Sequence, residues 1–331
     1  MSYIAVIGAG SWGTTLARLL AEKEYDVSLW VYEKDLCEEM KTTRVNRVYL
    51  PGFALPDNVA FTSDIETCVR NARYILNVVP SQFMRSVVRG ALQHIAGDSV
   101  IINAAKGIEK KTLLTGSSII REFSDHKVAV LSGPSFADEV ARKLPTAVTI
   151  ACEDTPTALL LQEIFNTQYF RVYTHDDILG VELGGALKNV LAIASGICDG
   201  LQLGHNARAA LLTRGLTEIK RLGVAMGARE YTFSGLSGLG DLILTCTARL
   251  SRNYTLGTKL ASGRKLNDIL SESRSVVEGV ATSESAYELS RRYDVQMPFV
   301  EQVYKLLYEG KDPGDAVREL MNRALKTEFN A

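Results

Sequence analysis

The fold is decided by residues 3–13, YIAVIGAGSWG, in which a short apolar run leads into Gly8, Gly10 and Gly13. A helical pattern, TTLARLLAEK, follows directly. Glycines at this spacing permit a tight turn and let a pyrophosphate approach the free N–H groups at the start of the helix. The spacing alone also fits an ordinary glycine-rich turn, but a strand before it and a helix after it predict a dinucleotide-binding βαβ unit.

The second apolar run, residues 26–31, is followed by an acidic side chain at Glu33. This glutamate lies twenty residues beyond Gly13, where a carboxylate meets the adenosine ribose of a bound dinucleotide. Tyr32 either stacks on the adenine or covers the edge of the sheet. We therefore expect Glu33 and Tyr32 to contact the cofactor.

The neighbouring charges leave the choice of cofactor open. Glu33 would repel the 2′-phosphate of NADP and so favours NAD. Lys34 is adjacent, however, and Arg44 and Arg47 follow in a polar stretch. Both NAD and NADP remain candidates.

Residues 1–175 alternate short apolar runs with helical patterns, which indicates βαβ units and a mainly parallel, doubly wound sheet. The runs are apolar on both sides, as in strands that helices cover on both faces. The candidate strands are residues 3–8, 26–31, 74–79, 99–105, 127–133 and 146–151.

Residues 176–331 change character, since long helical patterns follow one another and no convincing strand is found among them. The sequence predicts two domains: a dinucleotide-binding domain, residues 1–175, and a helical domain, residues 176–331. The expected helices of the second domain are residues 180–197, 206–226, 253–262, 283–293, 298–308 and 313–325.

Composition excludes several classes of function. The net charge of −1 over 331 residues gives no field that would attract nucleic acid. The five cysteines and four histidines are scattered, without CxxC or HExxH spacing, which argues against disulfides and a metal site. The longest apolar runs are broken by glycine or charge, and the N-terminus enters a strand at once. We expect a reduced, cytoplasmic protein without metal and without membrane association.

The stretch VELGGALKNVLAIASG, residues 181–196, places a lysine and an asparagine inside an apolar run. At helical spacing Lys188 shares a face with the small residues Gly184 and Gly185. We expect these glycines to let the nicotinamide and the substrate lie close to the helix, with Lys188 as general acid and Asn189 as a substrate or lysine contact. The alternative is an ordinary core helix whose lysine extends to the surface.

Polar residues follow two further candidate strands. Lys106 comes at the end of residues 99–105, and ligands of open parallel sheets bind at that edge. SGPSFA, residues 132–137, reads as strand, turn and helix start, with backbone groups around Gly133, Ser135 and Ala137 free to meet a ligand. The plain alternatives are a surface lysine and an ordinary capped helix.

The helical half holds a second set of polar residues. Asp241 follows a glycine-rich loop, and it either caps a helix or pairs with Lys188 and offsets the cost of burying that lysine. Ser251 is expected to cap the next helix. Arg252 at that helix start opposes the helix dipole unless an anion such as a phosphate lies between them. Glu278 either reaches the cofactor or is solvated.

Seven motifs in this order resemble the NAD(P)-dependent sn-glycerol-3-phosphate dehydrogenases of the bacterial type. They are GAGSWG, NAAKG, LSGPSFA, ELGGALKNV, GLGDLILTCT, SRN and VVEG, and they span nearly the whole chain. The resemblance implies a Rossmann domain followed by an all-α domain of the 6-phosphogluconate-dehydrogenase type, and a homodimer. It also implies NAD(P)H-dependent reduction of dihydroxyacetone phosphate to sn-glycerol 3-phosphate, the precursor of glycerophospholipids.

The resemblance also implies roles for individual residues. Lys188 matches the acid/base lysine, Lys106 touches both cofactor and substrate, and we expect Asp241 to complete the catalytic group. Tyr32 departs from the family pattern, in which histidine or arginine is common. The other matched cofactor contacts are Ser11, Trp12, Tyr32, Ala137, Arg252, Val276 and Glu278, and the other matched substrate contacts are Gly133, Ser135, Asp241, Ser251, Arg252 and Asn253.

Two other functions remain open at this point. One is a dehydrogenase of the same two-domain architecture that acts on another hydroxy or keto acid, whose carboxylate would also suit Arg252. The other is a non-catalytic NAD(P)-binding sensor, which would have no need of Lys106, Lys188 and Asp241 together.

Overall fold

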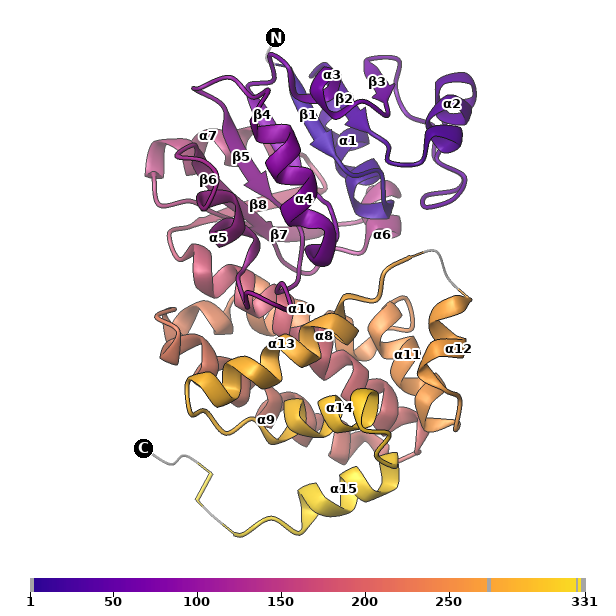
Figure 1. Ribbon diagram of the computed structural model, residues 1–331, viewed down its shortest axis with the longest axis vertical. Helices are drawn as coiled ribbons and strands as arrows, with labels where there is room; N and C mark the ends of the chain where they lie inside the picture. Colours follow the sequence, from indigo (N-terminus) through magenta and orange to yellow (C-terminus); the bar gives the residue numbers. More distant parts are fainter. Residues whose placement is uncertain (1–2, 273–274, 326, 329–331) are drawn as a thin grey trace.

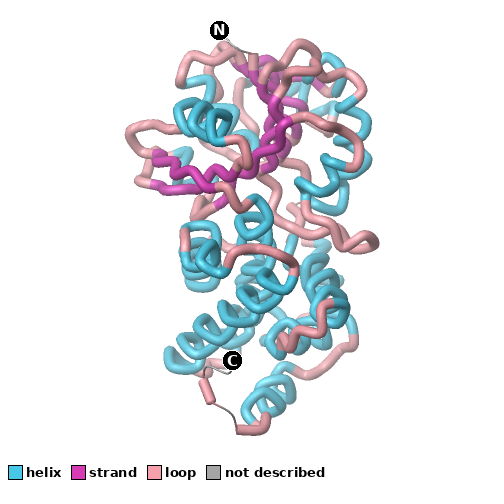
Figure 2. The backbone as a smooth tube through the Cα atoms, turned by 90° about the vertical axis from the view of Figure 1, so that its left-hand side faces the viewer, coloured by secondary structure: helices cyan, strands magenta, loops and turns pink. Residues whose placement is uncertain are grey.

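The computed structural model describes residues 3–272, 275–325 and 327–328. The chain forms an α/β part that contains an eight-stranded sheet and a helical part beneath it in the view of Figure 1. Figure 2 shows the two parts from the side, with the strands confined to the first. The predicted fold class, a doubly wound α/β domain followed by a helical domain, is confirmed.

The sheet has the strand order β3-β2-β1-β4-β5-β6-β7-β8, and the order reverses between β1 and β4. All neighbouring strands are parallel except β6 and β7, which are antiparallel. The strands are β1 (Ile4–Ile7), β2 (Val27–Trp30), β3 (Val59–Thr62), β4 (Tyr74–Asn77), β5 (Val100–Asn103), β6 (Lys127–Ser132), β7 (Thr146–Ala151) and β8 (Phe170–His175).

Helices cover both faces of the sheet because alternate side chains of each strand point to opposite faces. Ile4 and Val6 of β1 belong to one core, with side chains of α1 and α7. Ala5 and Ile7 face the other way, toward α3 and α4. The helices of this part are α1 (Ser11–Glu22), α2 (Lys34–Thr43), α3 (Ile65–Val69), α4 (Ser81–Leu92), α5 (Gly116–Arg121), α6 (Ala137–Ala141) and α7 (Thr155–Phe165).

Two strands, β3 and β8, were not predicted. They form the two edges of the sheet, and their side chains alternate between buried and exposed. A half-exposed edge strand lacks the continuous apolar run by which the central strands were recognised. The sequence pattern was therefore sufficient for the centre of the sheet and insufficient for its edges.

The helical part is organised around α8 (Ile178–Gly200), most of whose side chains are buried. This helix is long and apolar enough to cross a membrane, contrary to the expectation from sequence, but 89% of the apolar window lies inside the protein. It is the core helix of the part that surrounds it (Figure 1). The other helices are α9 (Gly204–Ala225), α10 (Asp241–Thr247), α11 (Arg252–Ala261), α12 (Leu266–Ser271), α13 (Glu278–Arg292), α14 (Pro298–Tyr308) and α15 (Pro313–Met321).

The glycine-rich segment before Asp241 is helical, although a loop was expected. A 3-10 turn, η1 (Glu230–Ser234), is followed by a π-helical turn, η2 (Leu236–Gly240). A Cβ on Gly238 would lie 2.2 Å from the carbonyl oxygen of Phe233. The glycine therefore permits close packing of the backbone here, and η2 leads directly into α10.

Candidate active site

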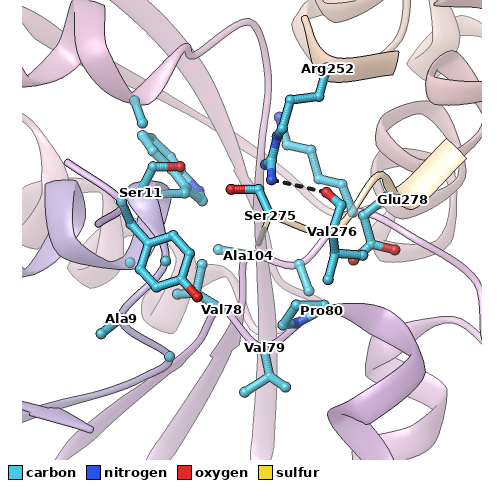
Figure 3. A pocket seen from close by; sticks show the side chains of 18 of the residues that line it. Ala9, Ser11, Val78, Val79, Pro80, Ala104, Arg252, Ser275, Val276 and Glu278 are labelled. Atoms are coloured by element: carbon cyan, nitrogen blue, oxygen red, sulfur yellow. Dashed lines mark hydrogen bonds between the residues drawn. The ribbon is translucent and has the colours of Figure 1, made fainter. Parts of the chain in front are cut away.

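A cavity of about 770 Å³ lies where the strand order reverses, at the carboxyl ends of β1, β4 and β5. This is the edge at which open α/β sheets bind their ligands, and the volume suits a small-molecule site. Side chains from α11 and from the start of α13 close the opposite side (Figure 3). Every site residue predicted from sequence lines this cavity except Gly133 and Asp241, which reach it through Lys106.

The three glycines of the first turn have different roles. Gly8 has a φ of +113°, a conformation that other residues rarely adopt. A Cβ on Gly13 would lie 1.9 Å from the carbonyl oxygen of Gly8, so this glycine lets α1 approach the strand. A Cβ on Gly10 would meet no described atom within 4 Å and would extend into the cavity instead. Gly10 is thus the position that keeps the space for a ligand open.

The start of α1 fits a pyrophosphate. Gly10 is its N-cap and provides no side-chain cap, and the first turn carries no acidic residue. The indole nitrogen of Trp12 is buried, and no described residue accepts its hydrogen bond. Unpaired N–H donors at a helix N-terminus favour an anion, so this end of the cavity suits the phosphates of a dinucleotide.

A lysine pair and one carboxylate occupy the junction between the two parts of the chain. Lys188 donates to Oδ1 of Asp241 at 2.6 Å and to the hydroxyl of Thr245 at 2.7 Å. Lys106 donates to Oδ2 of the same aspartate at 2.7 Å and to the carbonyl oxygen of Gly133 at 2.8 Å. The predicted pairing of Asp241 with Lys188 is present, and the alternative role of Asp241 as a helix cap is not, because its side chain accepts no backbone hydrogen bond at the start of α10.

Burial controls the protonation of this cluster. It lowers the pKa of Lys188 from its ordinary 10.5 to about 8, and the positive charge of Lys106 adds to the shift while Asp241 opposes it. Burial is the larger of these causes. Burial alone would raise the pKa of Asp241, yet the two lysines outweigh it and hold that pKa below its usual range. The cluster therefore holds a carboxylate and a lysine that titrates near neutral pH.

The glycines of α8 serve the packing of the protein itself, which corrects the expectation that they admit the ligand. A Cβ on Gly184 would lie 2.7 Å from the carbonyl oxygen of Ser237 in η2. A Cβ on Gly185 would lie 2.6 Å from the hydroxyl of Ser132 and 3.6 Å from the stem of Lys106. The small residues bring η2 and the Lys106 side chain against the helix, so that Lys188 and Lys106 can share one aspartate.

Asn189 and Asn253 join three helices at this place. The amide of Asn189 donates to the carbonyl oxygen of Lys106 at 3.2 Å, and its oxygen accepts from Asn253 at 2.9 Å. Asn253 in turn accepts from the N–H of Gly279 at 3.0 Å. Both side chains line the cavity while they hold α8, α11, α13 and the Lys106 backbone together.

The start of α11 presents an arginine to the cavity. Ser251 caps the helix as predicted, since its hydroxyl accepts from the N–H of Tyr254 at 3.2 Å. Arg252 follows as the first helical residue and donates to the carbonyl oxygen of Val276 at 2.9 Å. Figure 3 shows this contact on the side of the cavity opposite Ser11. An arginine and a helix N-terminus together suit an anion.

Glu278 is neither solvated nor free. Its carboxylate accepts from the N–H of Ser81 at 2.9 Å and from the Ser81 hydroxyl at 2.6 Å, which connects α13 to the start of α4. Burial raises the pKa of Glu278, and these two hydrogen bonds oppose that shift. Val276 and Glu278 thus border the cavity next to the sheet (Figure 3).

Sequence reasoning missed Thr245 and Ser81. Thr245 lies four residues after Asp241, so both point from the same face of α10 toward Lys188. That spacing was a usable signal, once a helix had been expected there. Ser81 carried no local signal because its partner lies 197 residues away. In the part of the chain that the structure describes, no group of three or more His, Cys, Asp or Glu side chains could hold a metal ion.

Comparison with known proteins accounts for both parts of the chain. Residues 3–158 match the family described as NAD-dependent glycerol-3-phosphate dehydrogenase N-terminus, and residues 177–318 match its C-terminus. This chain belongs to the glycerol-3-phosphate dehydrogenase family. The resemblance found in the sequence is confirmed, and the chain is accordingly an NAD(P)-dependent oxidoreductase.

Individual members of the family are similar over their whole length. The glycerol-3-phosphate dehydrogenase [NAD(P)+] of Syntrophotalea carbinolica is 54% identical, with 99% of both chains covered. The crystal structure of the Coxiella burnetii glycerol-3-phosphate dehydrogenase superposes with a TM-score of 0.94 at 42% identity, covering 97% of this chain and 99% of that one. The Saccharomyces cerevisiae enzyme gives a TM-score of 0.83 at 30% identity over 97% and 99%.

Proposed function

We propose that this member of the glycerol-3-phosphate dehydrogenase family reduces dihydroxyacetone phosphate to sn-glycerol 3-phosphate with NADH or NADPH, and so supplies the backbone of glycerophospholipids. The observation that carries the proposal is the Lys188–Asp241–Lys106 cluster, whose two lysines line one cavity together with an uncapped helix start and an arginine. A cationic acid, a dinucleotide site and an anion site are the three parts that the reaction needs.

Lys188 is the proposed general acid. When bound, the reduced nicotinamide supplies a hydride to the carbonyl carbon of the substrate. Negative charge then develops on the carbonyl oxygen, and Lys188 transfers its proton to that oxygen. A lysine with a pKa of about 8 is protonated at neutral pH, yet gives up its proton more readily than an exposed lysine. Asp241 and Thr245 hold the ammonium group in place.

The phosphate of the substrate is assigned to the start of α11. Arg252 and the N-terminal N–H groups offer charge-assisted hydrogen bonds to a dianion. Ser251, Asn253, Gly133 and Ser135 are the further proposed substrate contacts, together with Asn189 and Lys106. A substrate without the phosphate group should therefore bind with much lower affinity.

The cofactor is assigned to the glycine turn and the cavity wall. The residues that would hold it are Gly8, Gly10, Ser11, Trp12, Gly13, Tyr32, Glu33, Lys106, Ala137, Arg252, Val276 and Glu278. Residues 1–175 are the proposed dinucleotide-binding domain, and residues 176–331 are the proposed substrate-binding and catalytic domain. Lys106, Gly133 and Ser135 contact the substrate from the first domain, and Arg252, Val276 and Glu278 contact the cofactor from the second. Tyr32 is exposed by 75% beside the cavity, and this accessibility supports its stacking on an adenine.

The assembly and compartment are further parts of the proposal. All five cysteines are buried as free thiols, which supports a reducing compartment, and we propose the cytoplasm. We also propose a homodimer, as the family resemblance implies. Sedimentation equilibrium would test the dimer, and a purely monomeric chain would contradict it.

A spectrophotometric assay tests the reaction. The wild type should consume NADH or NADPH when dihydroxyacetone phosphate is present, and unphosphorylated dihydroxyacetone should be a poor substrate. A 2-keto acid serves as the control for the alternative class of substrate. Rapid turnover of the keto acid with none of dihydroxyacetone phosphate would refute the proposal.

A further inference from the structure

A buried asparagine, Asn103, ends β5 three residues before Lys106. Asn103 is exposed by only 1% and does not line the cavity. Its amide nitrogen donates to Oε1 of Glu182 on α8 at 2.9 Å. Its amide oxygen accepts from the N–H of Ala105 at 3.3 Å and from the side chain of Asn77 on β4 at 2.9 Å. One side chain therefore joins two strand ends, the turn toward Lys106 and the core helix.

Glu182 is a buried carboxylate whose direction is fixed by hydrogen bonds. Besides Asn103, the N–H of Ser117 donates to its Oε1 at 2.8 Å, and the Ser117 hydroxyl donates to its Oε2 at 2.5 Å. Burying a carboxylate is costly, and an apolar side chain could fill the same space at a lower cost. What the hydrogen bonds add over an apolar contact is a defined alignment of α8 with the end of β5.

The same face of α8 contacts the chain again beyond Asn103. Glu182, Gly185 and Asn189 are spaced i, i+3 and i+7, so they share one face of the helix. A Cβ on Gly185 would lie 3.6 Å from the stem of Lys106. The amide of Asn189 donates to the carbonyl oxygen of Lys106 at 3.2 Å. The helix thus contacts this stretch of chain at three successive points, and the Glu182–Asn103 hydrogen bond is the first of them.

The alignment determines where the ammonium group of Lys106 lies. Its Nζ is 2.7 Å from Oδ2 of Asp241 and 2.8 Å from the carbonyl oxygen of Gly133. A backbone shift of about 1 Å at Lys106 would lengthen these contacts beyond ordinary hydrogen-bond distances. Lys188 would then be left with Asp241 while the second cation moved away.

We propose that Asn103, held by Glu182, is a positioning residue of the active site, which sets the place of the Lys106 ammonium group beside Asp241. Neither Asn103 nor Glu182 lines the cavity, so both act through Lys106. The proposal rests on the roles given to Lys106 and Lys188 under the proposed function.

A double-mutant cycle between Asn103 and Lys106 tests whether the asparagine acts through the lysine. Asn103→Ala should lower kcat/KM for dihydroxyacetone phosphate ~10- to 100-fold, the size of loss that a misplacement of about 1 Å produces. Lys106→Met should cause a larger loss. When Asn103→Ala is added to Lys106→Met, kcat/KM should change less than ~2-fold, because the group that Asn103 positions has already been removed.

The pH profile is a second readout, which a purely structural role would not change. Burial is the main cause that lowers the pKa of Lys188; Asp241 and Cys246 of α10 raise this pKa, and Lys106 lowers it further. Asn103→Ala should move the charge of Lys106 away from Lys188. The pH at which kcat falls should therefore rise by about 0.5 to 1 relative to the wild type.

Asn58→Ala is the matched control. The amide of Asn58 donates to the carbonyl oxygens of Ala21 at 2.9 Å and Tyr25 at 2.7 Å, and Asn58 lies outside the cavity. This variant loses side-chain hydrogen bonds of the same kind, so its stability should fall. Its kcat/KM should stay within two-fold of the wild type, and its pH profile should be unchanged.

Asn103→Ser keeps the test decisive if Asn103→Ala does not fold. The serine hydroxyl can still accept from the N–H of Ala105, but it is too short to reach Glu182. We expect kcat/KM to fall ~3- to 10-fold, because the turn is kept and its link to α8 is lost.

Two results would overturn the positioning role. One is an equal fold loss from Asn103→Ala in the wild type and in Lys106→Met. The other is a folded Asn103→Ala or Asn103→Ser variant with the kcat/KM and pH profile of the wild type. Turnover of dihydroxyacetone phosphate by the wild type would leave the proposed function intact in both cases, whereas no turnover by the wild type would overturn both proposals.

Discussion

Replacing Lys188 by methionine should separate catalysis from folding. The methionine keeps the length of the stem and removes the charge. Asp241 is not left unpaired, because Lys106 still donates to it at 2.7 Å and Thr245 at 3.1 Å. We therefore expect Lys188→Met to fold and to bind NADH like the wild type.

The expected loss of activity follows from the role of the lysine. Removing a general acid lowers the rate by ~10²- to 10⁴-fold. The fall should appear in kcat, because the phosphate contacts at Arg252 are untouched. The stability of the folded protein should not fall with the activity, since burial holds the folded-state pKa of Lys188 at about 8, below its ordinary 10.5. At pH 7 the lysine is charged in both states and its burial is unfavourable, so methionine should leave the unfolding temperature equal or higher.

The pH profile gives an independent measurement. Reduction by the wild type needs the protonated lysine, so kcat should fall as the pH rises through about 8. The profile of Lys188→Met should be flat in that range. Steady-state kinetics from pH 6 to pH 10 and a thermal melt at pH 7 measure both effects.

Lys111→Met is the control, since Lys111 is exposed and lies outside the cavity. It should turn over within two-fold of the wild type. If Lys188→Met folds, binds NADH and turns over within a few-fold of the wild type, Lys188 is not the catalytic acid. A folded variant with an unaltered pH profile would lead to the same conclusion.

Four further substitutions test other parts of the cavity site and one buried carboxylate outside it. Gly10→Ala should keep the unfolding temperature but weaken NADH binding in a fluorescence titration, and unchanged affinity would contradict the cofactor placement. In Gly13→Ala the new Cβ would lie 1.9 Å from a carbonyl oxygen, so this variant should lower the free energy of unfolding by ~1–3 kcal/mol. Arg252→Ala should lower kcat/KM for dihydroxyacetone phosphate by ~30- to 1,000-fold, equivalent to ~2–4 kcal/mol. The value of kcat/KM for unphosphorylated dihydroxyacetone should change little. Equal losses of kcat/KM for the two substrates would mean that the arginine has a structural role. Glu182→Gln replaces a buried acceptor of the Ser117 N–H and hydroxyl and of the Asn103 amide, and chemical denaturation should show a loss of ~1–3 kcal/mol. An unchanged denaturation midpoint would show that these hydrogen bonds add no net stability.

The sequence determined the features that depend on local pattern. The strand, glycine turn and helix at residues 3–22 form one continuous unit, so its chemistry can be recognised from neighbouring residues. The same holds for Ser251, which caps the helix that follows it. The central strands were predictable because helices bury both of their faces, whereas β3 and β8 at the edges were not.

The tertiary structure decided which distant residues meet. Lys106, Lys188 and Asp241 are separated by 82 and 53 positions, and only the crossing of α8 with the sheet edge and α10 brings them together. The glycines of α8 were expected to make room for the ligand, because helical periodicity shows that small residues share a face but not what packs against that face. In the structure, backbone and side chains of this chain fill the space beside the glycines. The choice between NAD and NADP was left open for the same reason. The sequence shows that Arg44 and Arg47 follow Glu33 closely along the chain. Only the structure shows that the guanidinium group of Arg44 donates to the carbonyl oxygen of Pro56 and that the guanidinium group of Arg47 pairs with Glu39.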